Sequence, residues 1–130
     1  VILAHALKAS GVDVMDCSSG GIAGSATAAN GQKRQPGFQV GYSQRVRQDV
    51  EMATMAVGLI THPKQAEDIL VQEGADLIAI GREALVDPMW ASHAALALGF
   101  DVDFDTGSNE SGWWLPSRQK TSDFYVAMDG

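Results

Sequence analysis

Apolar and polar residues follow two different spacings over roughly the first hundred residues of the chain. Apolar residues spaced three to four apart predict helices, and short apolar runs bounded by glycine or polar residues predict strands. Helices are expected at residues 1–10, 42–51, 63–74 and 88–99, and strands at 12–17, 54–61 and 76–80. A short helical turn is expected after Arg82. Strands that alternate with helices predict parallel pairing through right-handed crossovers.

Residue types that start and stop helices fall at the ends of these segments. Glycine readily ends a helix, whereas Ser, Thr, Asp and a first-turn Pro favour its start. Helix stops are expected at Gly11, Gly74 and Gly99. Helix starts are expected at Ser43, at Thr61 or His62 before Pro63, and at Asp87 before Pro88. The small, polar segment 18–37 has no periodicity, so it is expected to be a long loop.

The regular pattern ends near residue 100. Residues 1–100 form the expected α/β domain, and residues 101–130 are an acidic, polar connector followed by an aromatic-containing tail. An open doubly wound sheet and part of a (β/α)8 barrel both fit the first part, and periodicity does not separate them. Three strands are too few to close a barrel of eight.

Composition and charge exclude several classes of protein. The net charge of −7 argues against binding to nucleic acid, which depends on Lys and Arg neutralising phosphates. No apolar run approaches the roughly 20 residues that span a bilayer, and no secretory signal is recognisable, so a cytoplasmic protein without a membrane partner is expected. The solitary Cys17 fits a reducing compartment, and the three histidines lack zinc-ligand spacing. The chain starts at Val1 without an initiator Met, which suggests a fragment or a processed product.

A glycine followed by an arginine stands where the third expected strand ends. The carboxyl ends of parallel strands present free backbone N–H groups, and Gly81 lets a ligand oxygen approach them closely. Arg82 adds a planar fork of donors that suits phosphate, and Gly58 near the end of the preceding strand offers a second close approach. These residues predict a shared phosphate pocket. The alternative is a tight turn at Gly81 with Arg82 paired to Glu83 or Asp87.

Four segments in order carry a family resemblance: GVDVMDCSSGG, PGFQVGYSQRVR, MATMAVGLIT and ADLIAIGREALVDPMWA. Together they resemble the C-terminal part of the old yellow enzyme family, in its NADPH dehydrogenase and xenobiotic reductase branch. The resemblance runs from about Gly11 to Gly99. It implies an FMN-dependent (β/α)8 TIM barrel of which this chain supplies about strands six to eight. It also implies that Gly81 and Arg82 hold the FMN phosphate, with the loop at Gly58 beside them.

The resemblance further implies a role within a larger enzyme. In the family, hydride passes from NADPH or NADH to FMN and then to an activated alkene. The family's catalytic residues lie on the first five strands, so this chain is expected to contain none and to be inactive alone. The full-length protein is expected to be a homo-oligomer. Trp113, Trp114 and Arg118 are similar in kind to C-terminal residues that reach the neighbouring subunit's active site, although their spacing departs from the family's. Packing of the tail over the last helix is the alternative.

Other interpretations stay open on the sequence alone. Cys17 is expected to be a buried small hydrophobe rather than a nucleophile, since His5 belongs to a helix on the outside of the fold. Other phosphate-binding barrels, such as aldolase-like or isomerase-like enzymes, also end strand eight in a glycine, and they would bind a sugar phosphate instead of a flavin. A non-catalytic half-barrel that acts only by association is a third interpretation, because exposed strand edges favour pairing.

Overall fold

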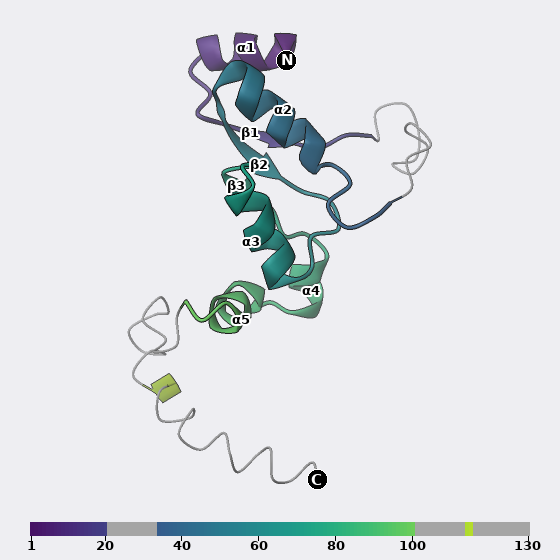
Figure 1. The fold of residues 1–130 in the computed structure, drawn as a ribbon, viewed down its shortest axis with the longest axis vertical. Coiled ribbons are helices and arrows are strands. Elements are labelled where there is room, and N and C mark those ends of the chain that lie inside the picture. The colour runs from purple at the N-terminus through teal and green to yellow at the C-terminus, as the bar shows by residue number, and fades with distance from the viewer. Residues whose placement is uncertain (21–33, 101–113, 116–130) are drawn as a thin grey trace. The chain divides into compact units, whose positions relative to one another are not determined.

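The structure is a computed structural model that describes residues 1–20, 34–100 and 114–115. Helices and strands alternate along it, as the sequence pattern predicts (Figure 1). Their order is α1 (Ile2–Ala9), β1 (Val14–Cys17), α2 (Val40–Val50), β2 (Ala53–Ala56), α3 (Pro63–Val71), β3 (Leu77–Ile78), α4 (Glu83–Val86) and α5 (Trp90–Ala97). The chain divides into two compact units, Val1–Pro88 and Met89–Gly130, and the sheet belongs to the first.

The strands form a three-stranded parallel sheet in the order β1-β2-β3. Cys17 of β1 pairs with Ala56 of β2, which in turn pairs with Ile78 of β3. α2 connects β1 to β2, and α3 connects β2 to β3. Both helices lie on the same side of the sheet, where Val40 of α2 and Ile69 of α3 meet at Gly74 (Figure 1). The expectation of parallel strands joined by helical crossovers is confirmed.

Only one face of this sheet is covered within the described residues. Side chains alternate between faces along a strand, so Thr54 and Ala56 share the face that α2 covers, and both are buried. The opposite face carries Val14, Asp16, Ala53, Met55 and Leu77. Val14 is 38% exposed and Leu77 is 45% exposed. Parallel sheets normally bury both faces, so this second, partly apolar face is suited to contact further structure.

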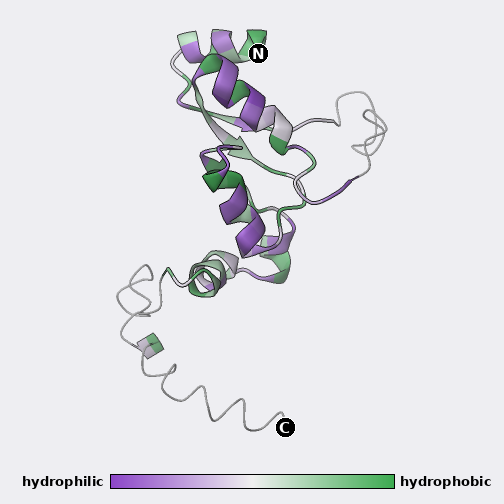
Figure 2. Cartoon of the chain, in the orientation of Figure 1, coloured by the Kyte–Doolittle hydropathy of each residue, from purple (hydrophilic) through white to green (hydrophobic). Residues whose placement is uncertain are grey.

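A small hydrophobic core lies between α1, α2 and the first two strands. Its buried members are Ala4, Cys17, Val46, Val50 and Met52, with Met15 and Tyr42 packed against them. The sides of α2 and α3 that face the viewer in Figure 2 are mainly hydrophilic, as expected for outer helices.

Lys8 fastens α1 to the end of α2. Its Nζ donates hydrogen bonds to the carbonyl oxygens of Val50 (2.7 Å) and Glu51 (2.8 Å). The last carbonyls of a helix have no partner within the helix, and the helix dipole favours a cation there. A residue of α1 thus caps α2, which ties together segments that lie far apart in the sequence.

Several element boundaries differ from the sequence prediction for identifiable reasons. Ser43 does not start α2, which begins at Val40. Its buried Oγ lies 2.8 Å from the carbonyl oxygens of both Val40 and Gly74, and its single O–H donates between them. β2 ends at Ala56 and not at Thr61, because the backbone leaves the extended region beyond it. β3 is only Leu77–Ile78. α5 begins at Trp90 with Met89 as its N-cap, whereas Asp87, the expected helix start, is the C-cap of α4.

At the end of α3, the positive φ and the close packing that favour glycine fall on two different residues, Glu73 and Gly74. The left-handed residue after the C-cap is Glu73, with φ of 59°, and the next residue, Gly74, donates its N–H to Ile69 O at 2.8 Å. Gly74 does not have the positive φ expected of a helix stop. It is a glycine because a Cβ there would lie 2.9 Å from Val40 Cγ1. Gly11 and Gly99 do adopt positive φ after α1 and α5, as predicted.

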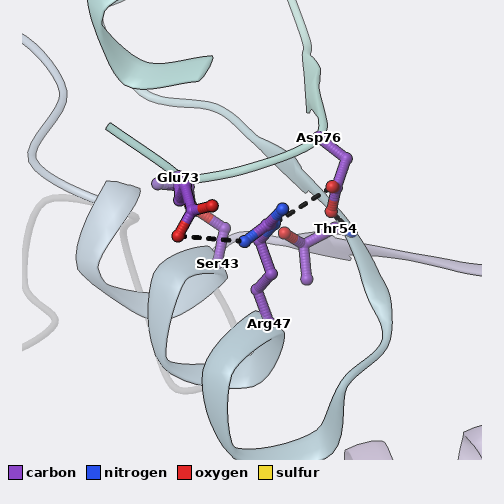
Figure 3. Close-up of polar contacts among 6 residues, drawn as sticks. Ser43, Arg47, Thr54, Glu73 and Asp76 are labelled. Carbon is purple, nitrogen blue, oxygen red and sulfur yellow. Dashed lines mark hydrogen bonds and ion pairs between the residues drawn. The ribbon is translucent and has the colours of Figure 1, made fainter. Parts of the chain in front are cut away.

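A polar network fixes the N-terminal edge of the sheet (Figure 3). One oxygen of Asp76 accepts a hydrogen bond from the Thr54 N–H at 2.9 Å, and the other accepts from Arg47 Nε at 3.0 Å. Asp76 also donates its own N–H to Thr54 O at 3.0 Å. The Thr54 N–H, and then the Arg47 guanidinium, hold the pKa of Asp76 below its ordinary range. Glu73 lies 3.8 Å from the same guanidinium, a weak and exposed contact.

Candidate functional site

The segments that follow β2 and β3 line one cleft. β2 and β3 are parallel neighbours, so their carboxyl ends lie at the same edge of the sheet. The cleft there has a volume of about 310 Å³. Its lining residues are Val57, Gly58, Leu59, Ile60, Thr61, Ala79, Gly81, Arg82 and Glu83. The structure therefore brings together the three residues that the sequence assigned to phosphate binding, Gly58, Gly81 and Arg82.

Gly81 has open space next to its Cα, where any other residue would place a Cβ. A Cβ built at this position meets no heavy atom of the described residues within 4 Å. Gly81 does not have a positive φ, so its backbone conformation is one that other residues adopt. Neither packing nor conformation within the described chain requires a glycine here. Gly81 lines the cleft, and the open space beside its Cα leaves room for a further atom next to the backbone.

Gly58 lies in the same cleft for a different reason. Its φ of 121° belongs to the region that favours glycine, and a Cβ there would lie 3.0 Å from Phe38 Cε1 and 3.3 Å from Gln39 Cγ. Its carbonyl oxygen accepts a hydrogen bond from the Gly37 N–H at 2.9 Å. The glycine is needed for this close packing, and the sequence prediction did not distinguish that need from contact with a ligand.

Arg82 presents an exposed guanidinium at the rim of the cleft. No ion pair in the described ranges involves it, so the alternative pairing with Glu83 or Asp87 is not formed. The following helix α4 has only four residues, so its dipole adds little to the site. The chemistry available is a planar cationic donor next to an unobstructed stretch of backbone. That combination suits a phosphate or carboxylate group.

Two glutamines that the sequence analysis did not single out support the strand-end segments. Gln39 is 7% exposed, and its Nε2 donates to Ser19 O at 3.2 Å and to Ser19 Oγ at 3.4 Å, which ties the residues after β1 to the start of α2. Gln65 of α3 bonds the segment after β2 through both ends of its carboxamide. A glutamine outside any motif gives no signal of such a role in the sequence.

Cys17 is buried in the core, as predicted. It is 4% exposed, and burial, followed by the nearby Asp16 carboxylate, raises the pKa of its thiol. A raised pKa leaves little thiolate at neutral pH, which is the opposite of what a nucleophile needs. In the part of the chain that the structure describes, no cluster of His, Cys, Asp or Glu has the arrangement of a metal site.

Of the three tail residues assigned to a subunit contact, the structure describes only Trp114, which is 66% exposed. Trp113 and Arg118 lie outside the described residues. The subunit contact assigned to these three residues therefore stays a prediction.

Residues 2–99 match the family model described as the NADH:flavin oxidoreductase / NADH oxidase family. The chain belongs to this family. The match confirms the resemblance to the old yellow enzymes. It also implies that the α/β segment described above comes from a TIM barrel, not from an open doubly wound sheet.

Similar proteins in this family are NADPH dehydrogenases from several bacteria. The chain is 43% identical to the enzyme of Halalkalibacterium halodurans over 102 residues, which cover 78% of this chain and 29% of that protein. It is 41% identical to the enzyme of Bacillus subtilis over 107 residues, which cover 82% of this chain and 30% of that protein. The chain thus spans less than a third of the length of these relatives. Among its described helices, none combines the length and apolar character needed to cross a membrane.

Proposed function

We propose that this chain supplies the FMN-phosphate site of an FMN-dependent oxidoreductase. The cleft after β2 and β3 is the observation that carries the proposal, because it joins a guanidinium without an ion-pair partner in the described chain to a glycine with open space beside it. Arg82 holds the phosphate through charge-assisted hydrogen bonds, and Gly81 lets the phosphate oxygens approach the backbone. Gly58 keeps the opposite wall close to Phe38 and so sets the shape of the cleft.

We place β1, β2 and β3 as strands six, seven and eight of a (β/α)8 barrel. Their sequential order and the position of α2 and α3 on one side support this placement. On this proposal, the open face with Val14, Met55 and Leu77 lines the barrel interior. The cleft then lies at the carboxyl end of the strands, where TIM-barrel enzymes bind their ligands.

The activity of the whole protein is part of the same proposal. When bound, FMN supplies the hydride chemistry, since a flavin accepts hydride from NADPH or NADH and donates it to an activated alkene. This chain's residues bind and orient the phosphate end, and the catalytic groups belong to the remainder of the protein. We assign Trp113, Trp114 and Arg118 to a contact between subunits of a homo-oligomer. The cytoplasmic location is supported by the unpaired, buried Cys17 thiol.

Titration of FMN and riboflavin into the purified chain, followed by flavin fluorescence, tests the phosphate site. The wild-type chain is expected to bind FMN more tightly than riboflavin, which lacks the phosphate. Arg82→Ala should weaken FMN binding about 10- to 100-fold, since hydrogen bonds to charged groups are worth roughly 1.5–3 kcal/mol. Arg45→Ala is the matched control, because Arg45 is an exposed arginine that pairs with Asp49 outside the cleft.

Two results contradict the proposal. One is equal affinity of the wild-type chain for FMN and riboflavin, and the other is an Arg82→Ala chain that keeps the wild-type preference for FMN. If Arg45→Ala lost as much FMN affinity as Arg82→Ala, the loss would reflect the overall charge of the chain and not a contact at the cleft.

A further inference from the structure

The segment that follows β2 forms one wall of the cleft, and its backbone has two successive positive φ values. Gly58 has φ of 121°, and the next residue, Leu59, has φ of 51°. The left-handed region is unfavourable for a residue with a side chain such as leucine. Two successive positive φ values therefore need support from outside the segment. The buried side chain of the following Ile60 provides part of it.

Gln65 on α3 provides that support through both ends of its carboxamide. Its Oε1 accepts a hydrogen bond from the Thr61 N–H at 3.2 Å, and its Nε2 donates to Leu59 O at 3.2 Å. The side chain thus pairs with two backbone groups as a neighbouring strand would. The carboxamide also lies beside the Gly37 N–H to Gly58 O bond, since a Cβ on Gly37 would be 3.5 Å from Gln65 Nε2.

We propose that Gln65 is a positioning residue for the anion-binding cleft, an inference that rests on the function proposed above. It does not line the cleft; it acts through Leu59 and Thr61, which do. By holding these residues in place before a ligand arrives, it removes the cost of ordering the wall on binding. Among the described residues, the segment after β3, which forms the opposite wall, has no comparable hydrogen bond from a side chain. The ordering of the cleft before binding therefore comes from Gln65 and the segment after β2.

Gln65→Met tests this role because methionine has a similar length and helix propensity but no amide. Gln72→Met is the matched control, since Gln72 is an exposed residue at the end of the same helix and makes no side-chain bond to the segment in the described structure. FMN and riboflavin affinities are measured for both variants and the wild type. Hydrogen–deuterium exchange of the Thr61 amide, without flavin, reports directly on the bond to Gln65.

In Gln65→Met, FMN affinity is expected to fall about tenfold and riboflavin affinity by less than about twofold, while Thr61 exchanges faster. Gln72→Met should match the wild type. Equal losses for both flavins would indicate a merely structural role and overturn the proposal, as would an unchanged Thr61 exchange rate. A wild type without preference for FMN contradicts the proposed function itself. A wild type that prefers FMN, with a Gln65→Met chain that keeps the full preference, contradicts only the positioning role.

Discussion

Replacing Asp76 by Asn is expected to reveal how much the polar network at the N-terminal edge stabilises the fold. Asn keeps the size of the side chain but replaces one of the two carboxylate oxygens by an NH2 group, which only donates. The Thr54 N–H and Arg47 Nε bond different oxygens of Asp76, so one of these two donors would face an NH2 group in the variant. Loss of the charge-assisted bond to a part-buried N–H costs about 1.5–3 kcal/mol. The Arg47 pair adds less than about 1 kcal/mol, since its side chains are 31% and 34% exposed. We expect the free energy of unfolding to fall by about 2 kcal/mol near pH 7.

Urea denaturation followed by circular dichroism measures this change. Asp68→Asn is the matched control, because the Asp68 carboxylate pairs with Lys64 at an exposed position of α3 and accepts no backbone N–H among the described hydrogen bonds. Its expected loss is no more than about 0.5 kcal/mol. If the two variants lose the same stability, the Thr54 bond does not have the strength assigned to it.

The pH dependence gives an independent check with a defined sign. The pKa of Asp76 in the folded state lies below its ordinary value of 3.8, so its stabilising effect is fully present above that value. It is lost as the pH falls through the folded pKa. The difference between wild type and Asp76→Asn should therefore shrink as the pH is lowered below about 4. The reasoning would be refuted if the difference in free energy of unfolding stayed constant down to the lowest pH at which the chain is still folded.

Two further changes are expected from the described geometry. Glu73→Gly should raise the free energy of unfolding by about 0.5–1 kcal/mol, because Glu73 has φ of 59° and its contact with Arg47 is weak; urea denaturation that shows a loss would contradict this. The Cys17 thiol should react slowly with an aromatic disulfide reagent in the native chain and rapidly in urea, because it is buried and its pKa is raised; fast reaction without denaturant would argue against that burial.

The order of the elements could be predicted from the sequence because periodicity records which face each segment buries. The ends could not be predicted, because they depend on contacts between distant residues. Ser43 has a residue type that favours a helix start, yet its hydroxyl bonds Gly74 O, 31 residues away along the chain. The sequence pattern predicts that β2 continues to Thr61. The positive φ values at Gly58 and Leu59 end it earlier, and an apolar pattern does not report φ.

Residues of the candidate site could be predicted only where a residue type suited to binding phosphate directly follows a predicted strand. Gly81 and Arg82 directly follow a predicted strand, and they line the cleft as expected. Gly58 also lines it, but its φ of 121° and the closeness of Phe38, 20 positions earlier, explain why it is glycine, since a Cβ would lie 3.0 Å from the Phe38 ring. The supporting role of Gln65 depends on the path of the segment after β2, which the sequence pattern assigned to a strand.

The two ends of β3 differ in what they contribute, and this difference bears on how variants should be interpreted. Asp76 precedes the strand and ties it to α2 and β2 through bonds that are satisfied within the described chain. Gly81 and Arg82 follow the strand with open space and without an ion-pair partner there. Groups satisfied within the fold affect its free energy of unfolding, whereas groups left open affect binding. A loss of flavin affinity after a change at Arg82 is therefore evidence for the site, while the same loss after a change at Asp76 first requires a measurement of stability.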